Sequence, residues 1–261
     1  MSTAETAQQI NAAMEEPAPY MGDAPNTEVT LPVGVALDDD WVTLAEVREL
    51  TGEDEEYLAS VEKKDDLLYA EYMTEVLKRA VVRLGDHDIA SAPSILGRLA
   101  LADRDTLYLG IMKATYGDTR EIRLMCPHCE VSNDVLLSLE EDFPIKQPDF
   151  DPKEGLTVKS RNKTYRLRLP NGDDMVEVQK NTNNTAEFNT RVLANCALFD
   201  GSAPKDRLAW AKKLNVADRR KLIDTLLEIQ VGPDLKEVNA QCAECGKDIP
   251  LMLDWVSLLL G

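Results

Sequence analysis

The sequence predicts an α+β protein with a helical N-terminal part, two zinc-ribbon-like cysteine knuckles, and a large mixed α/β insertion between the knuckles. Three observations lead to this prediction. Apolar residues in the first half recur at helical spacing, strand-like alternation flanks each of two C-x-x-C pairs, and 112 residues, from Glu130 to Gln241, separate the pairs. Zinc ribbons commonly have only about 15 to 20 residues between their pairs. The insertion must therefore have a structure of its own.

The composition is that of a soluble globular protein. The chain has 261 residues, of which 44% are hydrophobic, enough for one large domain or two small ones. No apolar run approaches the roughly 20 residues needed to cross a bilayer, and the N-terminus lacks the basic and apolar regions of a signal peptide. We expect no membrane span and synthesis in a cytoplasm, where cysteines stay reduced rather than forming a disulfide framework.

Acidic residues are concentrated at the front of the chain. Of the net charge of −18, residues 1–60 contribute −13, from fourteen Asp or Glu and the single basic residue Arg48. This disfavours nucleic-acid binding by the N-terminal part, because phosphate contacts need Lys and Arg. The acids can dock on a basic protein surface, or they can simply form a solvated face.

The first 30 residues are expected to form a flexible acidic arm. They are rich in Ala, Glu, Pro, Thr and Asn and contain few large apolar groups. Such a segment cannot bury enough apolar surface to offset the entropy of ordering it. We expect residues 1–30 to become ordered only against a partner.

A helical segment is expected over residues 31–120. A short extended stretch at 31–35 precedes a helix built on four apolar residues, Val42, Leu44, Val47 and Leu50. Thr51 is a candidate N-cap for the next helix, with acids in the turn that follows it. Apolar spacing then predicts helices over 61–84 and from about residue 102 to the break at Tyr116-Gly117-Asp118.

Each cysteine pair lies at the tip of a predicted hairpin. Residues 121–125 alternate as a strand and lead into Cys126-Pro127-His128-Cys129, after which 131–139 return as a second strand. The second pair, Cys242-Ala243-Glu244-Cys245, has predicted strands at 236–240 and 249–253 on its two sides. Gly246 suits the positive φ that such a turn often requires. A two-part zinc ribbon is thus expected over residues 121–145 and 235–261.

The inserted mixed α/β domain is expected over residues 146–234. Pro144, Pro148 and Pro152 mark a linker at its start. A hairpin from 156–158 and 165–169 is followed by predicted helices over 171–180, 184–199 and 216–231. Gly232-Pro233 is expected to end the last helix.

The four paired cysteines have the ligand number and spacing of one structural zinc site, with Cys126, Cys129, Cys242 and Cys245 as ligands. A catalytic zinc needs an open coordination position and usually has His or carboxylate ligands, whereas four thiolates close the shell. The alternatives are two unrelated pairs of free thiols or a redox C-x-x-C, although the strand and helix context of a thioredoxin is missing. We expect one structural zinc.

No catalytic or cofactor-binding arrangement is recognisable, and we expect the protein not to be an enzyme. The chain has no G-x-S-x-G, no phosphate-binding loop and no H-E-x-x-H. His128 is expected to face solvent, His87 to lie in a surface loop, and Cys196 to be a buried small hydrophobe. The basic run at 161–168 could grip phosphate, but we interpret it as an exposed edge strand protected by charge. Nucleic acid is therefore not the expected partner.

Five segments occur in a characteristic order between residues 30 and 145. They are Leu31-Pro32-Val33-Gly34, Leu50-Thr51-Gly52-Glu53-Asp54-Glu55-Glu56, Leu101-Ala102-Asp103-Arg104-Asp105-Thr106-Leu107, Tyr116-Gly117-Asp118 and Cys126-Pro127-His128-Cys129. This succession resembles the baseplate protein and baseplate hub assembly chaperone family of contractile-tailed bacteriophages. The second pair, with Leu253-Asp254-Trp255 and the apolar end, is similar to the closing knuckle of related tail proteins. The first pair departs from the pattern, since Glu130 stands where a glycine often follows.

The resemblance implies a structural virion protein of the tail baseplate, made in the host cytoplasm. Its partners would be other tail or baseplate proteins, in an assembly of multiple copies. One alternative is a hub assembly chaperone of the same family that leaves before the virion is complete. An alternative of another class is a zinc-ribbon adaptor that binds nucleic acid. Such a chain could be encoded by a phage or a prophage, or it could belong to a cellular injection device.

Overall fold

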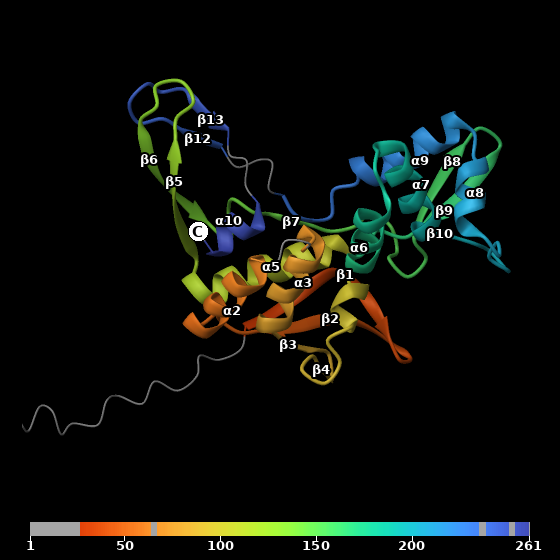
Figure 1. Ribbon diagram of the computed structural model, residues 1–261, viewed down its shortest axis with the longest axis horizontal. Helices are drawn as coiled ribbons and strands as arrows, with labels where there is room; N and C mark the ends of the chain where they lie inside the picture. The colour runs from red at the N-terminus through yellow and green to blue at the C-terminus, as the bar shows by residue number, and fades with distance from the viewer. Residues whose placement is uncertain (1–26, 64–66, 235–238, 251–253, 261) are drawn as a thin grey trace, which may run out of the picture.

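The computed structural model describes residues 27–63, 67–234, 239–250 and 254–260 (Figure 1). Most of the expected acidic arm, residues 1–26, and parts of the strands expected at 236–240 and 249–253 lie outside the described residues. The described chain is a mixed α/β structure with several small sheets. No helix among the described residues has the length and apolar character needed to cross a bilayer.

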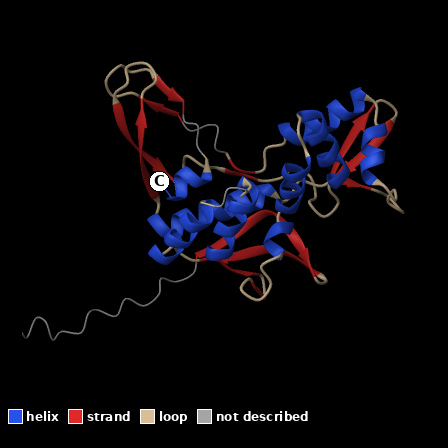
Figure 2. Cartoon of the chain, viewed as in Figure 1, coloured by secondary structure: helices blue, strands red, loops and turns tan. Residues whose placement is uncertain are grey.

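An antiparallel sheet forms one layer of the main body. Its strands occur in the order β1-β2-β3-β4, with bounds β1 (Thr27–Leu37), β2 (Asp40–Val47), β3 (Val81–Leu84) and β4 (His87–Asp88). Three helices, α2 (Gly52–Glu62), α3 (Tyr69–Ala80) and α5 (Leu101–Tyr116), lie over one face of this sheet (Figure 2), and the short helix α4 (Ile95–Arg98) contacts α3. Leu107, Ile111 and Met112 of α5 are fully buried in the resulting core.

Two of the helix predictions for this part of the chain are wrong. The helix expected over 42–50 is the strand β2, which pairs with β1 on one side and β3 on the other. The helix expected over 61–84 begins as α3 at Tyr69 and ends at Ala80, because Val81–Leu84 join the sheet as β3. The helix expected from residue 102 to residue 116 is confirmed as α5. The N-terminal part is thus mixed rather than helical.

The N-terminus of α2 is closed by a capping box, as predicted for Thr51. The Thr51 hydroxyl accepts a hydrogen bond from the Asp54 N–H, and the Asp54 carboxylate accepts one from the Thr51 N–H. Asp54 is fully buried and also accepts hydrogen bonds from Arg48 and Arg79. It therefore ties α2 to the end of β2 and to α3.

A bulge in β1 is held by α5. The pairing of β1 with β2 shifts register between Thr30 and Val35. In this stretch the N–H groups of Val33 and Gly34 donate to the two carboxylate oxygens of Asp103, at 2.8 and 3.0 Å. Burial raises the pKa of Asp103 to about 7, although both N–H donors oppose this. Two segments that are about 70 residues apart in the chain, and that both carry the family resemblance, are thus in direct contact.

The insertion contains a hydrophobic core of its own, formed between residues 156 and 228, which we call the inserted module. Its elements are β8 (Leu156–Ser160), β9 (Lys163–Leu167), α6 (Gly172–Asn181), α7 (Thr185–Cys196), β10 (Ala197–Leu198), α8 (Arg207–Lys213) and α9 (Val216–Glu228). The hairpin and the helices α6, α7 and α9 confirm the predicted elements, whereas α8 was not expected. The helix expected over 184–199 ends at Cys196, because Ala197–Leu198 pair with β9 as β10. The module lies at one end of the molecule, with the cysteine hairpins at the other (Figure 1).

The basic strand of the module is not an edge strand, contrary to our interpretation. Its sheet has the order β10-β9-β8, so β9 lies in the centre. Arg166 pairs there with Glu154 and Asp200, and Arg168 pairs with Asp174. These ion pairs explain how a run of cations is accommodated in a central strand.

Two short strands join the inserted module to the main body. β7 (Ile145–Lys146) pairs antiparallel with β11 (Gly232–Pro233), so the two connections run side by side. Gly232-Pro233 therefore belongs to β11, and α9 ends earlier than expected, at Glu228. After the second cysteine pair, α10 (Trp255–Leu260) packs against α5, where the Trp255 indole N–H donates to Asp105 at 2.7 Å.

Candidate metal centre

Two hairpins bring the cysteine pairs together. β5 (Thr119–Met125) and β6 (Ser132–Ser138) form the first, and β12 (Asn239–Gln241) and β13 (Asp248–Pro250) form the second. Both confirm the predicted hairpins within the described residues. Figure 1 shows the two tips meeting at the end of the molecule remote from the inserted module.

The two cysteine turns have the same backbone geometry. In the first, the Cys126 N–H donates to the Val131 carbonyl and the Glu130 N–H donates to the Cys126 carbonyl, both at 2.9 Å. In the second, Cys242 N–H to Lys247 O and Gly246 N–H to Cys242 O repeat these bonds at the same length. Each turn thereby directs both of its thiols toward the other turn.

The four sulfur atoms form one compact cluster. All of them lie within 4.8 Å of one another. The Sγ atoms of Cys126 and Cys245 are 3.7 Å apart, and those of Cys129 and Cys242 are 3.5 Å apart. A tetrahedral zinc with Zn–S bonds of about 2.3 Å places its sulfurs about 3.8 Å apart. The donor set and its spacing therefore fit a four-thiolate zinc ion.

The close contacts join cysteines of different pairs, and this argues against redox pairing within a C-x-x-C. A disulfide needs sulfurs about 2.05 Å apart, and all five cysteines are free. Cys126 and Cys242 are buried, while Cys129 and Cys245 are half-buried. The cluster thus crosses between the two hairpins and has little access to solvent.

Backbone N–H groups prepare the cluster to hold negative charge. The N–H groups of Cys245 and Glu244, together with neighbouring side chains, lower the pKa of Cys242 to about 6. Cys129 also has a backbone hydrogen bond that favours its thiolate, but burial and the neighbouring sulfurs outweigh it and raise the pKa to about 12. Adjacent thiolates repel one another, and a divalent cation would remove this repulsion.

Asn133 of β6 links the two turns and was not expected from the sequence. Its side-chain amide donates to the Val131 carbonyl at 2.9 Å and contacts the Cys242 sulfur at 3.6 Å. Its carbonyl oxygen accepts the Ala243 N–H at 2.9 Å. The only signal in the sequence is a polar residue at a position that alternation assigns to the inner face of β6. Asn133 orients a ligand in the way that hydrogen bonds around metal sites commonly do.

Replacing Asn133 by alanine is expected to weaken zinc binding about tenfold, because such supporting hydrogen bonds typically contribute 10- to 100-fold in affinity. Competition with a chromogenic chelator measures this change. Ser132→Ala is the matched control, since Ser132 is the exposed neighbour on the same strand. An Asn133→Ala variant with wild-type zinc affinity would show that the contact does not support the site.

Glu130 adopts the left-handed backbone conformation that glycine favours. Its φ is 60°, and Gly246 at the matching position of the second turn has a φ of 67°. The departure of the first pair from the family pattern therefore leaves the turn geometry unchanged and introduces local strain.

Glu130→Gly is accordingly expected to raise the free energy of unfolding by about 1 kcal/mol, and Gly246→Ala to lower it by a similar amount. Urea unfolding of the zinc-loaded protein measures both changes. Glu130→Ala separates the backbone effect from the loss of the carboxylate, and it should leave stability within about 0.5 kcal/mol of wild type. A stabilisation by alanine equal to that by glycine would contradict the backbone explanation.

The side chains of the other residues considered from the sequence do not belong to the cluster, although the His128 backbone N–H donates to the Cys126 sulfur at 3.4 Å. His128 is exposed, as predicted. His87 lies on the short strand β4, with its Nε2 3.8 Å from an oxygen of Asp38. Cys196 is fully buried in the core of the inserted module, and burial raises the pKa of its thiol to about 12. It is a buried hydrophobe, as predicted.

Comparison with known proteins gives one match. A family model described as "T4 bacteriophage base plate protein" matches residues 24–248. Neither the search of curated proteins nor the search of solved structures gives a match.

Proposed function

The chain belongs to the T4 bacteriophage base plate protein family, and from this membership we propose that it is a structural component of a phage tail baseplate. The match carries the proposal because it spans the main body, the inserted module and all four clustered cysteines. Other phage tail proteins are the partners that membership implies. Its place of synthesis would be the host cytoplasm.

The cysteine cluster would contribute a structural zinc ion with Cys126, Cys129, Cys242 and Cys245 as ligands. Four thiolates fill a tetrahedral shell, so the metal would have no open position for substrate. Its role would be to hold the second hairpin on the first, in a two-part zinc ribbon. The sulfur distances and the repeated turn geometry support this assignment.

The organisation of the chain fits a protein that acts through its surfaces. We divide it into an arm (expected over 1–30, but shorter because residues 27–30 belong to β1), a main body (to residue 120), a two-part ribbon (121–145 and 235–261) and an inserted domain (146–234). Hydrophobic clusters centred on the main body, the inserted module and the cysteine hairpins support this division. The main-body cluster also includes Leu137 and Trp255 of the ribbon segments, and a small cluster joins Val33 to Leu169 of the inserted domain. The family membership supports a role that does not involve catalysis.

Nucleic-acid binding is less well supported. In the basic run, Arg166 of the central strand and Arg168 just after it are already paired with carboxylates, so phosphate would have to displace these partners. A flat response in DNA and RNA binding at low salt, where phosphate contacts are strongest, is the expected result.

Mass spectrometry of purified phage particles tests the proposed function. A baseplate component should be present in a fixed ratio to the other tail proteins and should remain after the particles are washed at high salt. Absence from particles, with presence in lysates, would contradict the proposal. It would favour the alternative that the protein is an assembly chaperone of the baseplate hub.

A further inference from the structure

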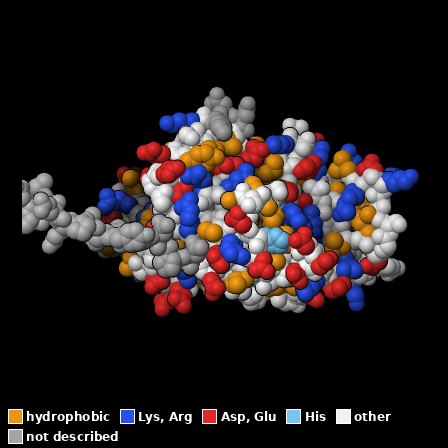
Figure 3. Space-filling model, turned by 90° about the horizontal axis from the view of Figure 1, so that it is seen from below, with side chains coloured by type: hydrophobic (Ala, Val, Ile, Leu, Met, Phe, Trp, Pro, Cys, Tyr) orange, Lys and Arg blue, Asp and Glu red, His pale blue; other side chains and the backbone are white. Residues whose placement is uncertain are grey.

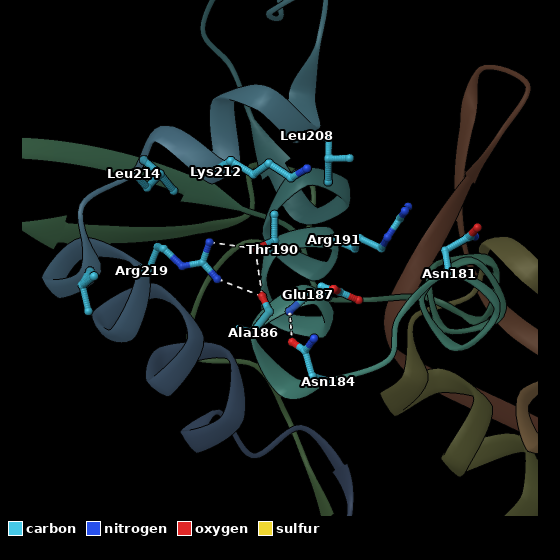
Figure 4. A pocket seen from close by; sticks show the side chains of 11 residues that line it. Asn181, Asn184, Ala186, Glu187, Thr190, Arg191, Leu208, Lys212, Leu214 and Arg219 are labelled. Atoms are coloured by element: carbon cyan, nitrogen blue, oxygen red, sulfur yellow. Dashed lines mark hydrogen bonds between the residues drawn. The ribbon is translucent and has the colours of Figure 1, made fainter.

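A wide groove on the inserted module lies between its helices. It has a volume of about 830 Å³ and is lined by the end of α6 and by residues of α7, α8 and α9 and the loops next to them (Figure 4). Figure 4 shows Lys212 and Leu208 on α8, Arg191 and Thr190 on α7, and Arg219 on α9 around this space. Val216 also lines a second hollow of about 610 Å³, which is formed by Arg161 and residues 215–224. We call the two together the module groove.

The module groove is basic within an acidic protein. The inserted module has fourteen Lys or Arg and nine Asp or Glu, a net charge of +5, whereas the whole chain has −18. Six cations line the groove, Arg161, Arg191, Lys212, Arg219, Arg220 and Lys221, against two acids, Glu187 and Asp224. Lys and Arg side chains are also visible at the module end of the face in Figure 3.

Most of these cations make no direct ion pair with a carboxylate, although Lys212 lies near Glu187 and Arg161 near Asp218. Arg191 pairs with Glu177. Arg219 donates to the Thr190 hydroxyl and the Ala186 carbonyl, which are neutral. Within the described ranges, no ion pair joins Arg161, Lys212, Arg220 or Lys221 to a carboxylate. The groove therefore offers positive charge that the protein does not neutralise by direct pairing.

The floor of the module groove is aliphatic. Leu208 and Leu214 are half-buried in it, and Val216 is 75% exposed. The lining contains no aromatic side chain, whereas proteins that bind single-stranded nucleic acid commonly stack bases on aromatic rings. An acidic segment with small apolar side chains matches both the charge and the floor better than a nucleic acid does.

The chain contains such a segment in its first 26 residues. They include Glu5, Glu15, Glu16 and Asp23 and no Lys or Arg. Ala7, Ile10 and Met14 recur at the spacing with which an amphipathic helix presents apolar side chains on one face. The acids at 38–40 and 53–56 are less suitable, because these short runs contain no apolar residue.

We propose that residues 1–26 of one copy of this chain occupy the module groove of a neighbouring copy. The described chain begins on the side of the main body near α2, away from the module (Figure 1), which favours contact with a neighbour over a return to the same copy. Contacts of this kind are heterologous and can link copies into a ring or a row. The inference goes beyond the proposed function and does not depend on it.

Charge reversal in the full-length, zinc-loaded protein tests this contact. The groove variant is Lys212→Glu with Arg220→Glu, and the segment variant is Glu15→Lys with Glu16→Lys. The matched control is Lys159→Glu with Lys205→Glu, two exposed lysines of the same module outside the groove. In sedimentation velocity, wild type and control should associate alike as concentration rises, and each test variant should associate about tenfold more weakly. Mixing the groove and segment variants should restore association, because the reversed charges again match.

Carbodiimide cross-linking of an equal mixture of ¹⁴N- and ¹⁵N-labelled wild type identifies the contact directly. Cross-links of mixed isotope content should join Glu15 or Glu16 to Lys212 or Lys221. Links of a single isotope content would show that the segment binds its own copy and would overturn the proposal. The proposal would also be overturned by a monomeric wild type or by a groove variant that associates normally. Cross-links to a different acidic segment, or salt-sensitive RNA binding that only the groove variant loses, would overturn it as well.

Discussion

Cys242→Ser is expected to lower the free energy of unfolding of the cysteine-hairpin region by more than about 4 kcal/mol and to abolish zinc binding, since structural zinc is coupled to folding. The second hairpin has few other attachments among the described residues. Apart from the sulfur cluster, it contacts the first hairpin through Ala240, Ile249 and the two bonds to Asn133. Loss of one ligand should therefore release residues 239–250, seen as faster amide hydrogen exchange, and lower the unfolding midpoint in urea.

Two comparisons make this result specific to the metal. Cys126→Ser should have the same effect as Cys242→Ser, because both remove one of four ligands, and chelation of wild type should reproduce it. Cys196→Ala is the matched control: it removes a buried thiol of the inserted module and should leave the zinc content unchanged. A Cys242→Ser protein that unfolds like wild type, with or without chelator, would refute a stabilising role for the cluster.

Asp54→Asn is expected to lower the free energy of unfolding by about 2–4 kcal/mol. The Asp54 carboxylate accepts from Arg48 at 2.6 and 3.0 Å, from Arg79 at 2.7 Å and from the Thr51 N–H at 3.0 Å. An amide would lose the charge and present its NH₂ group to one of these donors. Urea unfolding at neutral pH measures the loss. Glu53→Gln is the matched control, because Glu53 is exposed and its ion pair with Arg79 is long, at 3.9 Å.

The contribution of Asp54 to the free energy of unfolding should depend on pH in a defined direction. Burial raises the pKa of Asp54, but hydrogen bonds from Arg48, Thr51 and Arg79 outweigh it and hold the pKa well below its usual range. A carboxyl group whose pKa is lower in the folded state stabilises the folded protein, and this stabilisation is complete at pH values above the unfolded pKa of about 3.9. The difference between wild type and Asp54→Asn should thus be constant from pH 8 to about pH 5 and decrease only below pH 4. A difference that decreases already between pH 8 and pH 6 would show that the carboxylate is not held in this way.

The sequence was sufficient to predict the structure where a short segment determines its own conformation. The C-x-x-C turns with their flanking alternation, the N-cap at Thr51 and the long apolar pattern of α5 were all predictable from neighbouring residues. The cysteines could also be matched across 112 residues, because thiolates require a common partner. The requirement of zinc for four ligands thus provides long-range information that apolar spacing does not.

The elements that were predicted wrongly are mainly those whose structure depends on pairing with distant segments. Leu44, Val47 and Leu50 recur at helical spacing, but β1 and β3 both pair with this segment and make it a strand. Leu84 continues the apolar spacing of α3 by coincidence, although Val81 and Val82 already favour a strand. α8 is only seven residues long, too short for a periodic pattern to identify. Asn133 could not be identified, because its role depends on contact with the distant second turn.

The most direct test of the account is the metal itself. Protein purified without chelator should contain one zinc per chain, and X-ray absorption at the zinc edge should show four sulfur ligands at about 2.3 Å. Loss of the bound zinc in Cys245→Ser would complete the assignment, because this variant also removes one of the four ligands. Substoichiometric zinc, or a shell of nitrogen and oxygen ligands, would contradict the proposal that the four cysteines join the two hairpins through a structural zinc ion.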